Sequence, residues 1–166
     1  MIEARPARPD ELAEAGRVTE AAYREFVRPG ETDWEEYLAE VADANARASI
    51  GTVFVAVDEG RIVGSATLEL EGRIDHDDPP LDVDEAHIRM LGVAPEARGR
   101  GAARALMDAC VAAAVARGLT RMTLHTTLRM RGAKEMYEAM GFTRLPDRVL
   151  EDGFVLLTYE RRIGPG

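Results

Sequence analysis

Cysteine is almost absent from this sequence of 166 residues, in which Cys110 stands alone. A single cysteine excludes an internal disulfide, and it agrees with a reducing compartment. Long apolar runs are absent as well, since no stretch approaches the roughly 20 residues that a membrane helix needs. The first ten residues contain no apolar signal core. We therefore expect a cytoplasmic protein with no membrane partner.

Positive charge is scarce relative to negative charge: the sequence has 21 Lys and Arg residues and 30 Asp and Glu residues, for a net charge of −9. This balance argues against nucleic acid as a partner, because non-specific binding to phosphates needs a basic surface. It favours a cationic substrate instead. Apolar residues make up 46% and charged residues 31%, as in folded rather than disordered chains. The length predicts a single domain over residues 1–166.

The hydrophobic periodicity predicts an alternation of strands and helices. Helices are predicted after residues 9 and 32 and over 102–118 and 128–140, and strands over 2–7, 52–57, 62–70, 87–93, 121–126, 142–145 and 154–160. A helix that links two strands predicts a parallel pair, here 87–93 with 121–126. The expected fold class is α/β, with a mixed, mostly antiparallel sheet of about six or seven strands and about four flanking helices.

The stretch from Ala86 to Leu106 combines a buried strand, a glycine-rich turn and the start of a helix. Gly99 and Gly101 allow a sharp turn. The helix start that follows leaves backbone N–H groups unpaired, with the positive end of the helix dipole behind them. Such a turn can bind phosphate groups. It is neither a Walker A loop nor a dinucleotide fingerprint, because no Gly-Lys-Ser/Thr follows and Arg104 takes the last glycine position.

Two longer motifs stand out in the chain. The first is a strand ending in L-x-V-x-P followed by R-G-x-G-x-A, with Arg98, Gly101 and Ala103 at the R-x-x-G-x-A positions. The second is A-K-E-M-Y-E-A-M-G-F, from Ala133 to Phe142. Both motifs resemble those of the GNAT superfamily of N-acetyltransferases, and the resemblance covers about residues 86–142. It implies the GNAT fold and direct transfer of an acetyl group from acetyl-CoA to a primary amine of a small molecule or peptide, without a metal.

The same resemblance assigns roles to individual residues. Tyr137 would point at the thioester sulfur and protonate the leaving thiolate. A backbone N–H of the strand would stabilise the developing oxyanion, and that strand would pair with the pantetheine arm. The predicted residues that bind acetyl-CoA are Leu91, Gly92, Val93, Arg98, Gly99, Arg100, Gly101, Ala102, Ala103, Thr126 and Lys134.

The sequence departs from the family pattern at two positions. Met130 stands where many members carry an asparagine that binds pantetheine. Backbone groups, Thr126 or Lys134 must therefore bind the pantetheine arm instead. His87 stands where related sequences often have a glutamate, and its reference pKa of about 6.5 suits a general base. Strand alternation would place His87, Arg89 and Leu91 on one face. Glu85 and Glu69 are alternative bases.

The polar loop from Glu71 to Asp84 carries a cluster of acidic residues with His76 among them. It is either solvated or forms an acidic rim that attracts an amine. A metal site at His76 is not expected, because nothing fixes ligand geometry there. Two alternative functions stay open for the whole chain: use of another acyl-CoA, and a non-catalytic acyl-CoA-binding or sensing domain. The oligomeric state, monomer or homodimer, is open as well.

Overall fold

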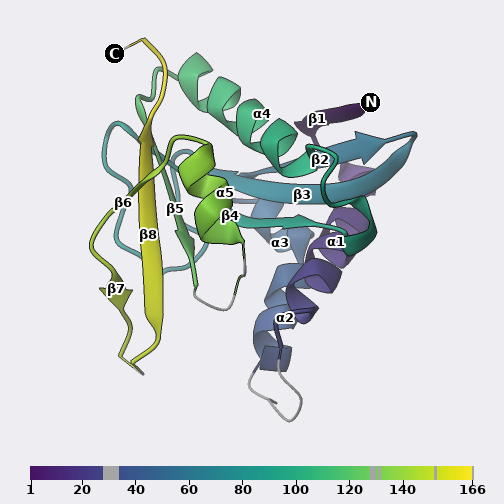
Figure 1. The fold of residues 1–166 in the computed structure, drawn as a ribbon, viewed down its shortest axis with the longest axis horizontal. Helices are drawn as coiled ribbons and strands as arrows, with labels where there is room; N and C mark the ends of the chain where they lie inside the picture. The colour runs from purple at the N-terminus through teal and green to yellow at the C-terminus, as the bar shows by residue number, and fades with distance from the viewer. Residues whose placement is uncertain (28–33, 128–129, 131, 152, 166) are drawn as a thin grey trace.

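The computed structural model describes residues 1–27, 34–127, 130, 132–151 and 153–165. Its strands form a sheet in the order β1-β2-β3-β4-β5-β8-β6, and β7 pairs with β8 outside that path (Figure 1). The strands are β1 (Ile2–Pro6), β2 (Thr52–Asp58), β3 (Arg61–Glu69), β4 (Glu85–Val93), β5 (Arg121–Thr126), β6 (Thr143–Arg144), β7 (Arg148–Val149) and β8 (Val155–Arg162). The pair β4–β5 is parallel, and the other pairs of described strands are antiparallel.

Helices cover both faces of this sheet (Figure 1). They are α1 (Leu12–Arg24), α2 (Trp34–Ala42), α3 (Ala44–Ala48), α4 (Ala102–Ala116) and α5 (Ala133–Ala139), with short 3-10 turns at Pro9–Glu11 and Pro95–Ala97. A side chain at Gly64 would contact Leu106 of α4, whereas one at Gly92 would contact Thr19 and Ala22 of α1. Because Gly64 pairs with Val93, the residue next to Gly92, α4 and α1 pack on opposite faces.

The predicted α/β fold class with one parallel pair is confirmed, with two additions. The described residues form eight strands and five α-helices, against about seven and about four expected. The additions are the two-residue β7 and the short α3, whose first turn is capped by Asp43, its carboxylate accepting from the Ala46 N–H at 3.0 Å. The helix predicted from residue 128 begins at Ala133, because Gly132 at φ +79° forms its N-cap. Residues 128, 129 and 131 of that prediction lie outside the described residues.

A bulge interrupts β4 immediately after Arg89. Ser65 pairs with Gly92 and Thr67 pairs with Arg89, so Met90 and Leu91 together face one residue of β3. Met90 has a left-handed backbone, at φ +54°. Such an extra residue inverts the alternation of side chains beyond it. The prediction that Leu91 shares a face with His87 and Arg89 is therefore wrong: Leu91 packs into the core on the α4 side.

The face of the sheet toward α4 is the main apolar core. Ile88 and Leu124 from the parallel pair belong to one buried cluster with Leu106 and Cys110 of α4. Burial raises the pKa of the Cys110 thiol to about 12, which makes it an inert core group. Within the described ranges, no helix combines the length and the apolar character needed to cross a bilayer.

Candidate active site

The edge of β4 that faces β5 is unpaired beyond the bulge. The parallel register runs from Glu85–Arg121 to Ile88–Leu124, and no pairing follows it among the described residues. The Ala94 N–H donates to the Val63 carbonyl of β3 at 2.8 Å. Because N–H groups alternate along a strand, those of Leu91 and Val93 face the side of β5, and that of Gly92 faces β3. Gly92 also lets α1 approach closely, since its Cβ would lie 3.2 Å from Ala22 Cβ.

The glycine turn that follows β4 leaves open space at its two glycines and backbone N–H groups without helical partners. Gly99 and Gly101 have φ of +80° and +87°, and Gly101 is the N-cap of α4 without a side-chain hydrogen bond. The first helical bond runs from Ala105 N–H to Gly101 C=O at 2.9 Å. The N–H groups of residues 102–104 therefore lack helical partners. A Cβ at either glycine would meet nothing within 4 Å, so a phosphate group fits against this turn.

Two arginines at the edge of the turn pair with carboxylates of the protein. Arg98 lies 2.8 Å from Glu25 just after α1, and Arg100 lies 3.0 Å from Asp58 at the end of β2. Both pairs are exposed to solvent, where an ion pair contributes little free energy. Either guanidinium group can therefore exchange its partner for a phosphate at small cost.

Tyr137 lies on α5 and belongs to the same buried cluster as Leu91 and Val93. Its side chain packs against the rings of Phe142 and Tyr159, at centroid distances of 6.0 and 6.3 Å. Burial raises the pKa of Tyr137 to about 12, so the phenol is protonated throughout the neutral range. Burial, Tyr37 and Tyr137 raise the pKa of Tyr23 of α1, whose ring lies 6.2 Å from that of Tyr37.

The remaining predicted contacts of pantetheine lie on both sides of the segment between β5 and α5. Thr126 is buried, and its hydroxyl lies 3.5 Å from the sulfur of Met130. The residue at the asparagine position of the family pattern thus contacts Thr126. Lys134 is exposed on the first turn of α5.

Three side chains on the face opposite α4 form a chain of hydrogen bonds. The Thr123 hydroxyl donates to the Glu85 carboxylate at 2.5 Å, and the His87 Nδ1 lies 2.7 Å from the same hydroxyl oxygen. Since a hydroxyl has one proton, His87 must donate through Nδ1, and its Nε2 carries the lone pair. Burial, together with the nearby His125, lowers the pKa of His87 well below its usual value, so the ring is neutral.

A cavity of about 270 Å³ lies beside this hydrogen-bonded chain. His87, Thr123 and His125 line it from the strands, Pro79 and Pro80 from the polar loop, and Arg148 from β7. The His87 and His125 rings stand 4.8 Å apart at its wall. The volume suits a small molecule or the end of a peptide.

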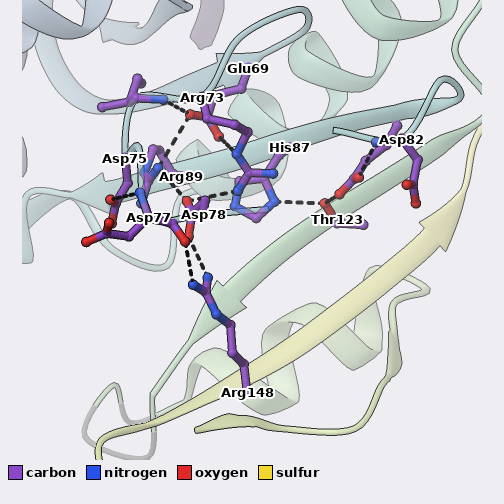
Figure 2. A network of polar contacts seen from close by, with 12 residues as sticks. Glu69, Arg73, Asp75, Asp77, Asp78, Asp82, His87, Arg89, Thr123 and Arg148 are labelled. Carbon is purple, nitrogen blue, oxygen red and sulfur yellow. Dashed lines mark hydrogen bonds and ion pairs between the residues drawn. The ribbon is translucent and has the colours of Figure 1, made fainter. Parts of the chain in front are cut away.

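A buried ion network lies next to the cavity (Figure 2). Asp78 of the polar loop contacts three guanidinium groups, those of Arg73 at 2.9 Å, Arg89 at 3.1 Å and Arg148 at 2.5 Å. Glu69 lies 3.4 Å from both Arg73 and Arg89. The Glu69 and Asp78 side chains are 0% and 4% exposed. Both carboxylates are therefore held in ion pairs inside the protein.

The polar loop is only partly the solvated segment that its composition favours. Asp75, His76, Asp77 and Asp82 are exposed, whereas Asp78 is buried in the ion network. No group of three or more metal-ligating His, Cys, Asp or Glu side chains occurs in the described part of the chain. The loop thus lines the cavity and is fastened to β4 and β7 through Asp78, and to β3 through the pair of Arg73 with Glu69.

Sequence reasoning missed the partners that surround His87. Thr123, His125 and Arg148 come from elements more than thirty residues away, and nothing local links them to His87. The alternation of polar residues in β4 and β5 was the available signal. A buried strand with polar side chains at every second position indicates a polar layer on one face.

Comparison with known proteins agrees with this geometry. Residues 17–142 match the sequence model of the acetyltransferase (GNAT) family. The chain is 30% identical over 125 residues to N-acetyltransferase 8F1 of Rattus norvegicus, covering 70% of this chain but only 54% of the rat protein.

Two solved structures share the fold at low sequence identity. PaiA N-acetyltransferase of Thermoplasma acidophilum, in complex with coenzyme A, has a TM-score of 0.73 at 14% identity, with 98% of this chain and 99% of that chain covered. The yncA protein of Salmonella typhimurium, solved with its cofactor acetyl-CoA, has a TM-score of 0.68 at 18% identity, with 99% and 95% covered. With its family match spanning most of its length, this chain belongs to the acetyltransferase (GNAT) family.

Proposed function

We propose that this protein transfers an acetyl group from acetyl-CoA directly to a primary amine of a small molecule or peptide. The observation that carries the proposal is the glycine turn where β4 ends: the N–H groups of residues 102–104 have no helical partner, and the space around the Cβ positions of Gly99 and Gly101 is open. The turn would hold the pyrophosphate through backbone N–H groups of residues 99–103, with Arg98 and Arg100 at its edge. The unpaired N–H groups of Leu91 and Val93 would bind the pantetheine arm as an added strand, assisted by Thr126 and Lys134.

Bound acetyl-CoA supplies the acetyl group as a thioester. The N–H of Leu91 next to the bulge would donate to the carbonyl oxygen as negative charge develops there. The Tyr137 phenol, which keeps its proton at neutral pH, would protonate the departing thiolate. Both groups are fixed by the fold, so neither needs to reorganise during the reaction.

We propose His87 as the general base, with Thr123 and Glu85 as positioning residues. The Thr123 hydroxyl holds Nδ1 as the donor and leaves Nε2 free to accept the proton of the amine, directly or through a water molecule. Glu85 would stabilise the imidazolium through Thr123, as a carboxylate does for other catalytic histidines. Glu85 and His87 then act as one unit rather than as alternatives.

The setting of the reaction is proposed on the same basis. We place the enzyme in the cytoplasm as one domain over residues 1–166, acting as a monomer or homodimer, with its acetyl-CoA-binding core at about 86–142. The single, buried Cys110 supports a reducing compartment.

The test is an assay of CoA release from acetyl-CoA in the presence of a panel of primary amines, with acetylated products identified by mass. Calorimetry measures the Kd for acetyl-CoA in parallel, and propionyl-CoA replaces acetyl-CoA in a second series. We expect amine-dependent CoA release and an acetylated amine. Tight binding of acetyl-CoA without acetylation of any amine would instead identify a binding or sensing domain.

A further inference from the structure

The buried polar layer on the α1 side of β4 holds more cations than anions. The ion network places the guanidinium groups of Arg73, Arg89 and Arg148 around two carboxylates, Glu69 and Asp78. A fourth guanidinium, that of Arg47 on α3, is 2% exposed. Buried charge without a counter-charge is unfavourable. The layer is therefore short of negative charge.

Arg47 binds only neutral groups in the described part of the chain. Its Nε donates to the Thr67 hydroxyl at 3.0 Å, and its Nη1 donates to the carbonyls of Glu40 and Val41 at 2.8 Å, at the end of α2. Its Nη2 is buried without a hydrogen-bond partner. Arg47 thus fastens α2 and α3 to β3 and leaves one buried donor without a hydrogen bond, with Asp43 as the carboxylate that acts on its charge.

Arg89 is more accessible than Arg47. Its Nη1 contacts both Glu69 and Asp78, and its Nε is buried without a hydrogen-bond partner among the described residues. The Arg89 side chain is 18% exposed and Arg47 only 2%, so a ligand can reach the exposed edge of the Arg89 guanidinium group but not Arg47. Burial lowers the pKa of Arg47, and the charges of Tyr23, Asp43, Tyr37 and Arg89 also act on it. Arg47 lies near Arg89, because its Nε donates to the hydroxyl of Thr67, the residue of β3 that pairs with Arg89 of β4.

Arg89 is also close to the proposed reacting centre. It directly precedes the bulge at Met90 and stands two residues before Leu91, about 7 Å along a strand. A group that binds Arg89 would therefore hold the atoms bonded to it near the thioester.

We propose that the amine acceptor carries a carboxylate beside its amine, as an α-amino acid does, and that Arg89 binds this carboxylate with the charge of Arg47 nearby. This inference rests on the proposed N-acetyltransferase function. In an α-amino acid the carboxylate and the amine share one carbon, so anchoring the carboxylate on Arg89 positions the amine at the carbonyl held by Leu91. A guanidinium group offers the planar pair of donors that a carboxylate fits. The carboxylate would also supply the missing negative charge.

The experiment compares matched acceptors at saturating acetyl-CoA. The panel contains the common L-amino acids, the amide of each, and the amine that each leaves on decarboxylation. We expect kcat/KM for the carboxylate forms to exceed that for the matched amides by about 10- to 100-fold, the usual range for a hydrogen bond to a charged group. Acetylation of amides or simple amines at equal or higher kcat/KM would overturn the inference while leaving the proposed function intact. Acetylation of none of the panel would overturn it as well, and failure with every primary amine would overturn the proposed function too.

Variants of Arg89 connect the preference to this residue. Arg89→Lys keeps a charge for Glu69 and Asp78 but loses the planar fork, so it should fold and lose most of the preference for carboxylates. Arg47→Gln should reduce the preference less, because Arg47 acts only through its charge and does not contact the carboxylate. Arg61→Gln, on the exposed start of β3, is the matched control and should keep the wild-type ratio. A folded Arg89→Lys protein with an unchanged ratio and a changed Tm would show that Arg89 is only structural.

Discussion

The two faces of the β4–β5 pair differ completely in chemistry although they alternate along the same residues. Toward α4, Ala86, Ile88 and Leu124 join an apolar core whose energy comes from area removed from water. Toward the polar loop, His87, Arg89 and Thr123 are buried or half-buried in a layer of ions and hydrogen bonds. Polar groups are expensive to bury, and each there needs a specific partner. The first face therefore stabilises the fold, and the second carries the groups able to do chemistry.

The largest effect, a loss of stability, should follow from removing the carboxylate of Asp78, which three arginines of the polar face share. Burial would raise the pKa of Asp78, but the hydrogen bond from Arg148 and the charges of Arg89 and Arg73 outweigh it and hold the pKa well below its usual range. Asp78→Asn leaves three guanidinium groups with one carboxylate, and we expect the free energy of unfolding to fall by about 3–5 kcal/mol. Urea denaturation at pH 7 measures this loss.

The same carboxylate makes stability depend on pH. Because its pKa is lower in the folded state, its contribution is complete above the unfolded value of about 3.9 and is lost as pH falls below it. Asp78→Asn should flatten this acid limb. Asp108→Asn, on the exposed side of α4, is the control: it should neither lower the free energy of unfolding nor flatten the acid limb. Equal losses in the two variants would show that the ion network contributes no more than a surface charge.

The next largest effect is a loss of kcat on removing the hydroxyl of Tyr137. Tyr137→Phe keeps the buried ring but removes the proton donor, so kcat should fall about 100-fold, or about 2.7 kcal/mol. The Kd for acetyl-CoA should not change, and stability should change by no more than about 1 kcal/mol. Tyr159→Phe is the control, because it removes a neighbouring buried hydroxyl that has no hydrogen-bond partner among the described residues. A Tyr137→Phe rate within about threefold of wild type, with chemistry rate-limiting, would assign Tyr137 to packing alone.

A smaller effect is expected at the glycine turn. Gly101→Val places a β-branched residue at φ +87° and fills the space predicted for phosphate, so affinity for acetyl-CoA should fall about tenfold or more. Gly60→Val is a close control, since Gly60 has φ +79° in the β2–β3 turn and also nothing within 4 Å of its Cβ. Both variants should lose similar stability from backbone strain. Calorimetric titration then separates strain from binding: equal affinities in the two variants would remove the pyrophosphate assignment.

The smallest effect should come from His87, because a base whose pKa is lowered is a weak one. His87→Gln should reduce kcat/KM at pH 7 by about tenfold. In the wild type, kcat/KM should rise with pH as His87 loses its proton, along a limb below the reference value of about 6.5. His125→Gln removes a neighbour that lowers this pKa and should move the limb to higher pH. A limb that persists in His87→Gln would instead report a carboxylate or the amine itself.

The reach of sequence-based prediction differs between the two faces. The strand, turn and helix from Ala86 to Leu106 could be predicted because local rules govern them: alternation, proline, glycine and apolar periodicity. The bulge at Met90 could not, since nothing in the sequence marks a left-handed methionine, and it overturned the shared face of His87 and Leu91. Asp78 looked like its exposed neighbours in the loop, and only its three arginine partners distinguish it.

By itself, the sequence determined the family, the order of the elements and the position of the glycine turn, because each depends on residues near one another in the chain. The tertiary structure alone decided which polar groups meet. It brought Glu85, Thr123 and His87 into one hydrogen-bonded chain, and it placed Arg47 on Thr67, the residue that pairs with Arg89, with one buried donor unused. Ion pairs and hydrogen bonds act over a few ångströms of space, and that proximity is created by the pairing of strands distant in sequence.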